Sequence, residues 1–340
     1  MAHIAVVGAG AIGGSVGALL HRAGHRVTLT GRPEQVHAIR KDGLLIRGAL
    51  GEFSAHLDVA ERLTERPEFA LIAVKTQDLA SAISENRASL TDVPVVTMQN
   101  GVRADDIAAQ YLSGSNIVSA VVLLAASYLT PGTISIQSRG SFVIGHPFKT
   151  DRPIVPTLRP VLDSAIPTRA TANIRGAHWL KLILNLNNAL PAVTNLPLPE
   201  IFAFEPLRRL GVLLIREGAR VIRRAGIKLD PLPQTPVALI RLVTMLPAGL
   251  AGRVAAARIR KSALNPDAAD PLLGSTLQSL RRGRPTEIDY LNGEIVRLGR
   301  DIGLPTPLNG FLVRIVHEIE STGEFWSAEK LAGVVDALTG

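Results

Sequence analysis

The chain of 340 residues contains no cysteine, is 46% hydrophobic and carries a formal net charge of +8 at pH 7. This length predicts two domains, and the absence of cysteine excludes disulfides, a thiolate metal site and a cysteine nucleophile. No metal site is expected. We expect a cytoplasmic protein without a membrane segment, because the N-terminus lacks the basic start of a signal peptide and no apolar run reaches about 18 residues.

An apolar, β-branched strand over Ile4–Val7 opens the chain and runs into a glycine-rich turn. Gly8, Gly10 and Gly13 have the spacing G-x-G-x-x-G, and a helix and a second strand are predicted to follow. The first glycine permits a tight turn, the second lets the backbone approach a pyrophosphate, and the third lets the helix pack closely on the strand. The N-terminus of the helix favours phosphate binding. We predict a dinucleotide site at Gly8, Gly10, Ala11, Ile12 and Gly13. The alternative is a plain glycine-rich turn between a strand and a helix.

The second strand is predicted to end without an acidic residue, at Thr30-Gly31-Arg32. Enzymes that use NAD tend to carry Asp or Glu at this point, where it accepts a hydrogen bond from the ribose 2′-hydroxyl. Arg32 can instead pair with a 2′-phosphate, which a carboxylate would repel. The pattern predicts NADP(H) as the cofactor, and the alternative is that Arg32 is only a solvated loop cation.

Strand and helix patterns alternate up to about residue 170, which is typical of a parallel doubly wound sheet. The later strands are expected to extend that sheet as a meander. The predicted elements are a helix over 11–22, a hairpin at 44–47 and 52–57 with Gly48 and Gly51 at its turn, and strands over 4–7, 26–30, 70–74, 93–98, 117–124, 133–137 and 141–144.

From residue 173 onward the sequence shows helical periodicity without strand-like alternation of any length. The fold class is therefore predicted as α/β, with a Rossmann-type dinucleotide-binding domain over 1–171 and an all-helical substrate and catalytic domain over 172–340. The predicted helices cover 176–190, 206–225, 272–281, 286–302 and 310–322. A proline-rich connection at 231–247 lies between the second and the third of them.

Positive charge concentrates between residues 201 and 300, which hold 17 Lys or Arg against eight Asp or Glu. Such a basic region can indicate nucleic-acid binding. Aromatic residues for base stacking make up only 4% of the chain, however, and the arginines between 208 and 224 have the spacing of a solvated helix face. We expect no nucleic-acid partner and favour anionic small molecules as ligands.

Polar side chains follow two of the predicted buried strands. Lys75 and Thr76 follow the strand at 70–74, and Asn100 follows the strand at 93–98. Ligands of open α/β sheets bind beyond the carboxyl ends of the strands, so these side chains are candidates for holding cofactor and substrate. The alternative is ordinary helix capping by Thr76 and Asn100.

Three polar side chains are predicted on one face of the first helix of the second domain. Lys181, Asn185 and Asn188 are spaced i, i+4 and i+7, among apolar neighbours that indicate a buried helix. Buried polar groups require partners, and burial lowers the pKa of a lysine, which suits a general acid. We expect Asn185 and Asn188 to bind the substrate. The alternative is a lysine that reaches solvent at the helix edge.

A third polar run extends from Gly274-Ser275 to the segment Thr-Glu-Ile-Asp-Tyr-Leu-Asn-Gly at 286–293. Thr286 can cap a helix whose first turn contains Glu287 and Asp289, because acidic residues are favoured there. This capping role is the alternative to a catalytic role for Glu287.

These motifs, in their order along nearly the whole chain, resemble the ketopantoate reductase (2-dehydropantoate 2-reductase) family. The resemblance implies NADPH-dependent reduction of ketopantoate to pantoate in pantothenate biosynthesis, with Lys75 beside the cofactor. The segments that carry the resemblance are Gly8 to Gly14, Val74-Lys75-Thr76, Gln99-Asn100-Gly101-Val102, Lys181 with Asn185, and 286–293.

The same resemblance implies roles for individual side chains. Lys181 would be the general acid at the ketone oxygen, and Glu287 would bind the substrate hydroxyl and help to orient the lysine. Asn100 and Asn185 would position lysine and substrate, and Ser275 would contact the substrate carboxylate.

Two departures from the family pattern leave the particular 2-keto acid open. Position 189 is alanine where many members carry asparagine followed by proline, and the stretch around 229–270 is longer than in compact members. The alternatives are a reductase of another branched 2-keto acid, and a non-catalytic NADPH-binding regulatory protein. A small-molecule substrate is expected, and a homodimer is one possible assembly.

Overall fold

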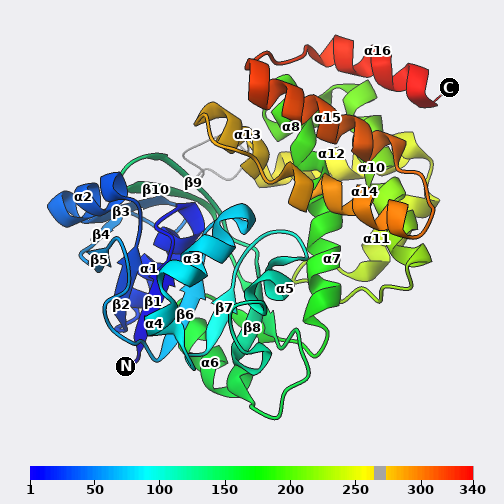
Figure 1. The fold of residues 1–340 in the computed structure, drawn as a ribbon. Helices are drawn as coiled ribbons and strands as arrows, with labels where there is room; N and C mark the ends of the chain where they lie inside the picture. The colour runs from blue at the N-terminus through cyan, green and yellow to red at the C-terminus, as the bar shows by residue number, and fades with distance from the viewer. Residues whose placement is uncertain (264–272, 340) are drawn as a thin grey trace. The chain divides into compact units, whose positions relative to one another are not determined.

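The computed structural model describes residues 1–263 and 273–339 (Figure 1). The described residues form two compact units, Met1–Ala177 and the residues from His178 onward. The division lies inside helix α7 (Ile174–Asn185), a few residues after the boundary that the sequence predicts between 171 and 172.

An eight-stranded sheet with the strand order β12-β11-β8-β7-β6-β1-β2-β5 forms the centre of the first unit. All neighbouring strands are parallel except β8 and β11, so the expected parallel doubly wound sheet is confirmed. The edge strands β5 and β12 are additional to the predicted set, because three residues are too few to show a clear alternation. The strands are β1 (His3–Val7), β2 (Arg26–Thr30), β5 (Asp58–Ala60), β6 (Phe69–Ile72), β7 (Val95–Thr97), β8 (Ile117–Val122), β11 (Phe142–Gly145) and β12 (Thr168–Ala170).

A second sheet of four strands has the order β4-β3-β10-β9. The expectation that all later strands extend the main sheet is therefore wrong: β11 joins it, but β10 pairs with β3 and β9. Ile134 and Ile136 of β10 are fully buried, and Ile134 lies directly against Gly14 of helix α1, so burial of this apolar face accounts for the separate sheet. The strands are β3 (Leu44–Gly48), β4 (Phe53–Ala55), β9 (Ala125–Thr130) and β10 (Thr133–Ser138).

Helices cover both faces of the main sheet. In β1, Ile4 and Val6 belong to one apolar core and Ala5 and Val7 to the other, as the alternation of side chains along a strand requires. Helices α1 and α6 pack on the first core, and α3 and α5 pack on the second. The helical elements of this unit are α1 (Ala11–Arg22), α2 (Pro33–Asp42), η1 (Thr76–Asp78), α3 (Leu79–Glu85), α4 (Arg87–Leu90), α5 (Ala104–Ala108), η2 (Gly114–Asn116) and α6 (Ile154–Asp163).

The second unit is helical, as predicted, and its longest helix is α10 (Glu205–Arg224). Leu207, Leu210, Leu214 and Val221 of α10 are buried, and arginines occupy its more exposed positions. Within the described ranges, no helix is both long and apolar enough to cross a bilayer. The other elements are η3 (Leu186–Asn188), α8 (Ala189–Thr194), α9 (Leu198–Ala203), α11 (Val237–Met245), α12 (Ala248–Ala263), α13 (Ser275–Arg281), η4 (Ile288–Tyr290), α14 (Asn292–Asp301), α15 (Pro307–Thr322) and α16 (Ala328–Thr339).

The segment around 229–270 contains two helices, α11 and α12, where the sequence predicts a proline-rich connection. Pro236 directly precedes α11 and Pro247 separates the two helices, positions at which proline interrupts no helical hydrogen bond. Arg216 of α10 donates hydrogen bonds to the carbonyls of Val243 and Leu246 and so ties the end of α11 to α10. The remainder of the segment, 264–272, lies outside the described residues.

Candidate active site

The glycine turn after β1 has the geometry that its spacing predicts. Gly8 has a φ of +114°, and a Cβ there would lie 2.8 Å from the backbone nitrogen of Val74. A Cβ at Gly13 would overlap the carbonyl oxygen of Gly8, so glycine is required for α1 to pack this closely. Among the described residues, no atom lies within 4 Å of a Cβ built at Gly10. This open side leaves room for a pyrophosphate, and Gly10, at the capping position of α1, makes no side-chain bond to the first-turn amides.

Arg32 is held beside the glycine turn by Gln35 of α2. The Gln35 Nε2 donates to the carbonyl of Ala9 at 2.9 Å, and the Gln35 Oε1 accepts the amide hydrogen of Arg32 at 3.0 Å. The half-exposed guanidinium pairs with Glu34, with 2.8 Å between Nε and Oε1. A 2′-phosphate at this place would therefore compete with Glu34 for the charge of Arg32.

Gln99 joins the ends of two neighbouring strands of the first unit. Its Nε2 donates to the carbonyls of Ile72 and Val74, at 2.9 Å each. Lys75 and Asn100 are the next residues of the two joined segments, and the glycine turn lies against Val74. The first unit thus brings the glycine turn, Lys75 and Asn100 to the same carboxyl edge of the sheet.

Neither Thr76 nor Asn100 caps a helix, so the capping interpretation of these residues is wrong. Thr76 lies inside η1, and its hydroxyl donates to the carbonyl of Asn100 at 3.3 Å. Helix α5 begins at Ala104, with Arg103 at the capping position and no side-chain capping bond. The side chain of Asn100 is therefore not committed to the helix that follows it.

Lys181, in the part of α7 that belongs to the second unit, has a perturbed pKa. Burial lowers the pKa of its ammonium to about 8, and the negative charge of Glu287 partly offsets this shift. Such a group is protonated at neutral pH and gives up its proton more readily than an ordinary lysine, as a general acid must. The residue is partly exposed, so the influence of the Glu287 carboxylate, more than complete burial, sets it apart from an ordinary lysine at a helix edge.

The α-helix that carries the predicted polar stripe ends before Asn188. Helix α7 ends at Asn185, and Leu186–Asn188 form a 3₁₀ turn. Pro191 explains the change, because it has no amide hydrogen to donate to the carbonyl four residues earlier, so the chain tightens before α8. Residues three apart in a 3₁₀ turn lie on the same side of the helix axis, so Asn188 stays aligned with Asn185 although the α-helix itself has ended.

Asn188 lies beside Ser275, which is 87 residues away in sequence. Its Nδ2 donates to the Ser275 Oγ at 3.5 Å. Gly274 has a φ of +74°, and a Cβ there would lie 3.2 Å from the Asn188 Oδ1. The second unit thus brings together two predicted substrate-binding side chains, each with a hydrogen-bond donor that suits a carboxylate.

Glu287 lies in a loop between α13 and α14. The helix predicted over 286–302 begins only at Asn292, and the side chain of Glu287 makes no capping bond to the short turn η4 that follows it. The Thr286 hydroxyl accepts the amide hydrogen of Ile288, while the Thr286 amide donates to Glu320 of α15 at 2.7 Å. The capping interpretation of Glu287 is therefore wrong, and its charge acts on Lys181.

Comparisons with known proteins identify the family to which both units belong. Residues 4–147 match the family model described as ketopantoate reductase PanE/ApbA, and residues 173–320 match the model of its C-terminal part. The two models together cover most of the chain. This chain belongs to the ketopantoate reductase family.

Individual relatives agree with this assignment. The 2-dehydropantoate 2-reductase of Pyrococcus horikoshii is 28% identical, over 94% of this chain and 98% of the relative. The crystal structure of a PanE/ApbA family ketopantoate reductase from Ralstonia eutropha is 30% identical, with a TM-score of 0.76 over 94% of this chain and 98% of that one. The family is one of oxidoreductases that act on CH–OH donors, and the chain is such an enzyme.

A D-mandelate dehydrogenase, solved with NADH and anilino(oxo)acetate, shares the fold. Its TM-score is 0.78 at 24% identity, over 94% of this chain and 99% of that one. NADH and anilino(oxo)acetate are ligands of that protein. At 24% identity this likeness shows a shared fold and assigns neither ligand to this chain.

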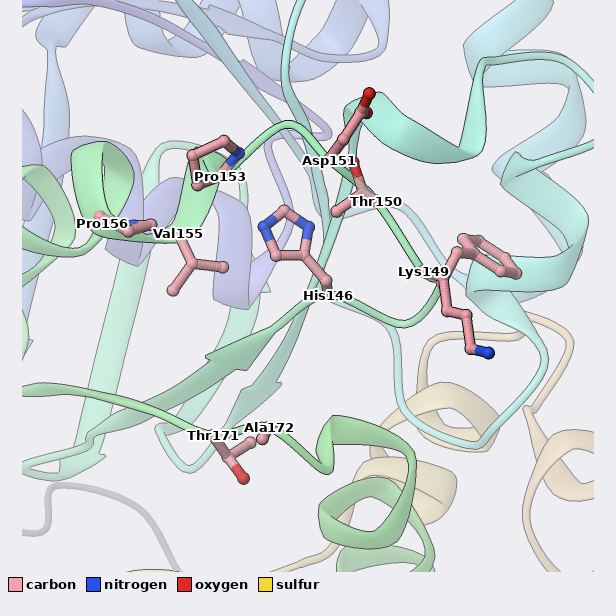
Figure 2. Close-up of a pocket in the computed structure, with 10 residues that line it drawn as sticks. His146, Lys149, Thr150, Asp151, Pro153, Val155, Pro156, Thr171 and Ala172 are labelled. Atoms are coloured by element: carbon pink, nitrogen blue, oxygen red, sulfur yellow. The ribbon is translucent and has the colours of Figure 1, made fainter.

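A separate hollow of about 580 Å³ lies in the first unit, and Figure 2 shows His146 pointing into its middle. Its lining contains none of the predicted site residues. His146 directly follows β11, which runs antiparallel to β8, so the hollow lies at the edge of the sheet where β8 begins. The glycine turn lies at the opposite edge, and we do not place the active site in this hollow.

Sequence reasoning missed the side chains that hold the site residues in place. Gln35 fixes the backbone of Arg32, and Glu320 fixes the backbone next to Glu287. Gln99 was named only within a segment that carries the family resemblance, without a role of its own. Each acts through a tertiary hydrogen bond, and no local pattern identifies the partner of such a bond.

Proposed function

We propose that this enzyme reduces 2-dehydropantoate to pantoate with NADPH, as a cytoplasmic step of pantothenate biosynthesis. The observation that carries the proposal is Lys181, a lysine with a pKa of about 8 under the influence of Glu287. Family membership supports the reaction class, and the names of the matched relatives support the substrate.

The proposed acid–base role of Lys181 follows from the charge that forms in the reaction. NADPH, when bound, supplies a hydride to the ketone carbon, and the carbonyl oxygen gains a negative charge. The Lys181 ammonium donates a proton to that oxygen and becomes a neutral amine. Its lowered pKa favours this transfer, and the negative charge of Glu287 keeps the ammonium form available near neutral pH.

The remaining proposed contacts use side chains with matching chemistry. Glu287 accepts a hydrogen bond from the substrate hydroxyl, and Ser275 and Asn188 donate to the substrate carboxylate. Asn185, one helical turn after Lys181, orients the lysine and the keto acid, and the family resemblance implies a positioning role for Asn100 as well. The short separation of Asn188 and Ser275 supports a shared ligand for these two residues.

The preference for NADPH is proposed from Arg32. The segment that follows β2 presents this guanidinium, whose backbone Gln35 fixes next to the glycine turn. Lys75 and Asn100 lie at the same edge of the sheet and are proposed to contact the cofactor. The proposed partners are NADPH and the 2-keto acid, and we propose no nucleic-acid partner. Size-exclusion chromatography will show whether the enzyme is a homodimer.

Initial rates of NADPH oxidation across a panel of 2-keto acids test the proposed function. We expect the highest kcat/KM with 2-dehydropantoate, and a lower value with NADH as the reductant. Another branched keto acid is the second candidate, because Ala189 and the helices α11 and α12 depart from the compact family pattern. No turnover with any member of the panel would contradict the proposal and favour a regulatory, non-catalytic protein.

A further inference from the structure

Glu287 belongs to a loop of residues 282–291 that links α13 to α14. Within this loop the backbone makes short-range hydrogen bonds, such as that from the Tyr290 amide to the Glu287 carbonyl at 3.0 Å. These local bonds set the shape of the loop. They do not set the distance between the Glu287 carboxylate and a lysine on another helix, which depends on tertiary contacts.

Helix α15 contacts the loop on both sides of Glu287. The Glu320 Oε1 accepts the amide hydrogen of Thr286 at 2.7 Å. The His317 Nε2 lies 3.0 Å from the Asp289 Oδ1, and the His317 Nδ1 lies 2.7 Å from the Glu320 Oε2. One helix therefore holds the residue before Glu287 and a residue two positions after it through a continuous chain of bonds.

The charges along this series of bonded side chains are complementary. Both ring nitrogens of His317 face carboxylate oxygens, so only the doubly protonated imidazolium donates to both. Burial lowers the pKa of His317, but the bonds and charges of Asp289 and Glu320 outweigh burial and raise this pKa above its ordinary value. Burial would raise the pKa of Glu320, but the bonds from Thr286 and His317 lower it overall.

We propose that Glu320 and His317 are positioning residues that hold Glu287 beside Lys181. They touch neither substrate nor cofactor, and they act through the backbone at Thr286 and the side chain of Asp289. The catalytic consequence rests on the proposed function, in which Glu287 binds the substrate hydroxyl and orients Lys181.

The variants Glu320→Ala and His317→Ala test this role, with Glu318→Ala as the matched control. Glu318 lies on the same helix and is exposed, and its side chain makes none of the contacts described above. We expect Glu320→Ala to lower kcat/KM about tenfold for 2-dehydropantoate and less for a keto acid without the hydroxyl. In a Glu287→Ala background the same change should cause no further loss, because the group that it positions is gone.

Two further measurements test whether α15 positions Glu287, and neither depends on enzyme activity. Hydrogen exchange of peptides from 282–291 should be faster in Glu320→Ala and His317→Ala than in wild type and Glu318→Ala. In ¹⁵N-lysine spectra, which contain signals from only seven lysines, the pKa of Lys181 should fall below about 8 when Glu287 moves away.

The outcomes separate the two proposals. Unchanged exchange and an unchanged Lys181 pKa would overturn the positioning role, and so would additive losses in the Glu287→Ala background. Equal effects of Glu318→Ala and Glu320→Ala would show a general weakening of α15 instead and also overturn it. A wild type that reduces no keto acid would overturn the proposed function, while exchange and the lysine titration would still decide whether α15 positions Glu287. Partial rescue by Glu320→Gln, whose amide oxygen can accept the Thr286 hydrogen, would support the positioning role.

Discussion

At the scale of single residues, Lys181 has the environment that its proposed role requires. Replacement by alanine should lower kcat by roughly 10²–10⁴-fold, the usual contribution of a general acid, while NADPH still binds. In wild type, the rate of reduction should fall as the pH rises through about 8, because the ammonium that donates the proton is then lost. Stopped-flow rates and fluorescence titration with NADPH measure the two effects. Near-normal turnover by a folded Lys181→Ala protein would show that the lysine is structural.

Glu287 should discriminate between substrates by their hydroxyl group. A lost charge-assisted hydrogen bond costs about 1.5–3 kcal/mol, so Glu287→Ala should lower kcat/KM for 2-dehydropantoate by about tenfold or more. A deoxy keto acid never made this contact and should lose less. Steady-state kinetics with both substrates provide the comparison, and parallel losses on the two would assign Glu287 a structural role.

Arg32 and Glu34 should have opposite effects on the use of NADPH. Arg32→Ala removes the partner of the 2′-phosphate and should raise the KM for NADPH by about tenfold, with little change for NADH. Glu34→Gln releases Arg32 from its 2.8 Å ion pair and should lower the KM for NADPH. Equal wild-type efficiency with both cofactors would contradict the assignment.

At the scale of elements, Glu217 of α10 fixes the start of α15. This carboxylate is only 7% exposed, and it accepts the amide hydrogens of Leu308 and Asn309 at 3.2 and 2.8 Å. The Asn309 side chain also donates to it, and the Asn309 Oδ1 accepts a hydrogen bond from Asn292, at the start of α14. A negative charge at a helix N-terminus is favourable, and here it aligns three helices.

Glu217→Ala should therefore lower the free energy of unfolding by about 2–5 kcal/mol, because buried donors lose their acceptor. Urea unfolding followed by circular dichroism measures this change. Glu200→Ala, in the exposed first turn of α9, is the control and should change stability by less than about 0.5–1 kcal/mol. A loss for Glu217→Ala no larger than for the control would show that α15 does not depend on this carboxylate.

The contact between α15 and the Glu287 loop should depend on pH in a defined window. The pKa of His317 is higher in the folded protein than its value of 6.5 in the unfolded chain. Protonation of His317 therefore stabilises the folded state below pH 6.5, and this contribution disappears as the pH rises through the pKa of the folded protein. The pKa of Glu320 is lower in the folded protein than its value of 4.5 in the unfolded chain. The ionised carboxylate therefore stabilises the folded state above pH 4.5, and this contribution is lost as the pH falls through the pKa of the folded protein. The stability difference between wild type and His317→Gln should therefore be larger at pH 6 than at pH 8.5. Urea midpoints at the two values measure it, and a difference independent of pH would contradict the charged state of His317.

At the scale of the whole molecule, local sequence patterns identified the class of each unit. The continuous apolar run of β1, the spacing of three glycines and the missing acid after β2 are features of residues close together in sequence, so they are visible without a structure. The same holds for the helical periodicity of α10. These patterns also supported the resemblance to ketopantoate reductases, which the family models confirm.

Element boundaries were predicted less well where a distant residue decides them. Thr286 was expected to begin a helix, but its amide hydrogen goes to Glu320, and α14 begins only at Asn292. Strand β10 was expected in the main sheet, but the buried face of Ile134 and Ile136 packs on α1 instead. In both cases tertiary burial or hydrogen bonding outweighs the local preference.

By itself, then, the sequence determined the two fold classes, the place of the glycine turn after β1 and the residue types that the proposed chemistry needs. Only the tertiary structure decided that Asn188 meets Ser275, that Glu287 acts on Lys181 from a loop, and that α15 holds that loop. Hydrogen bonds and Coulomb interactions depend on separation in space, and the periodicity of a chain carries no information about which distant residue will supply the partner.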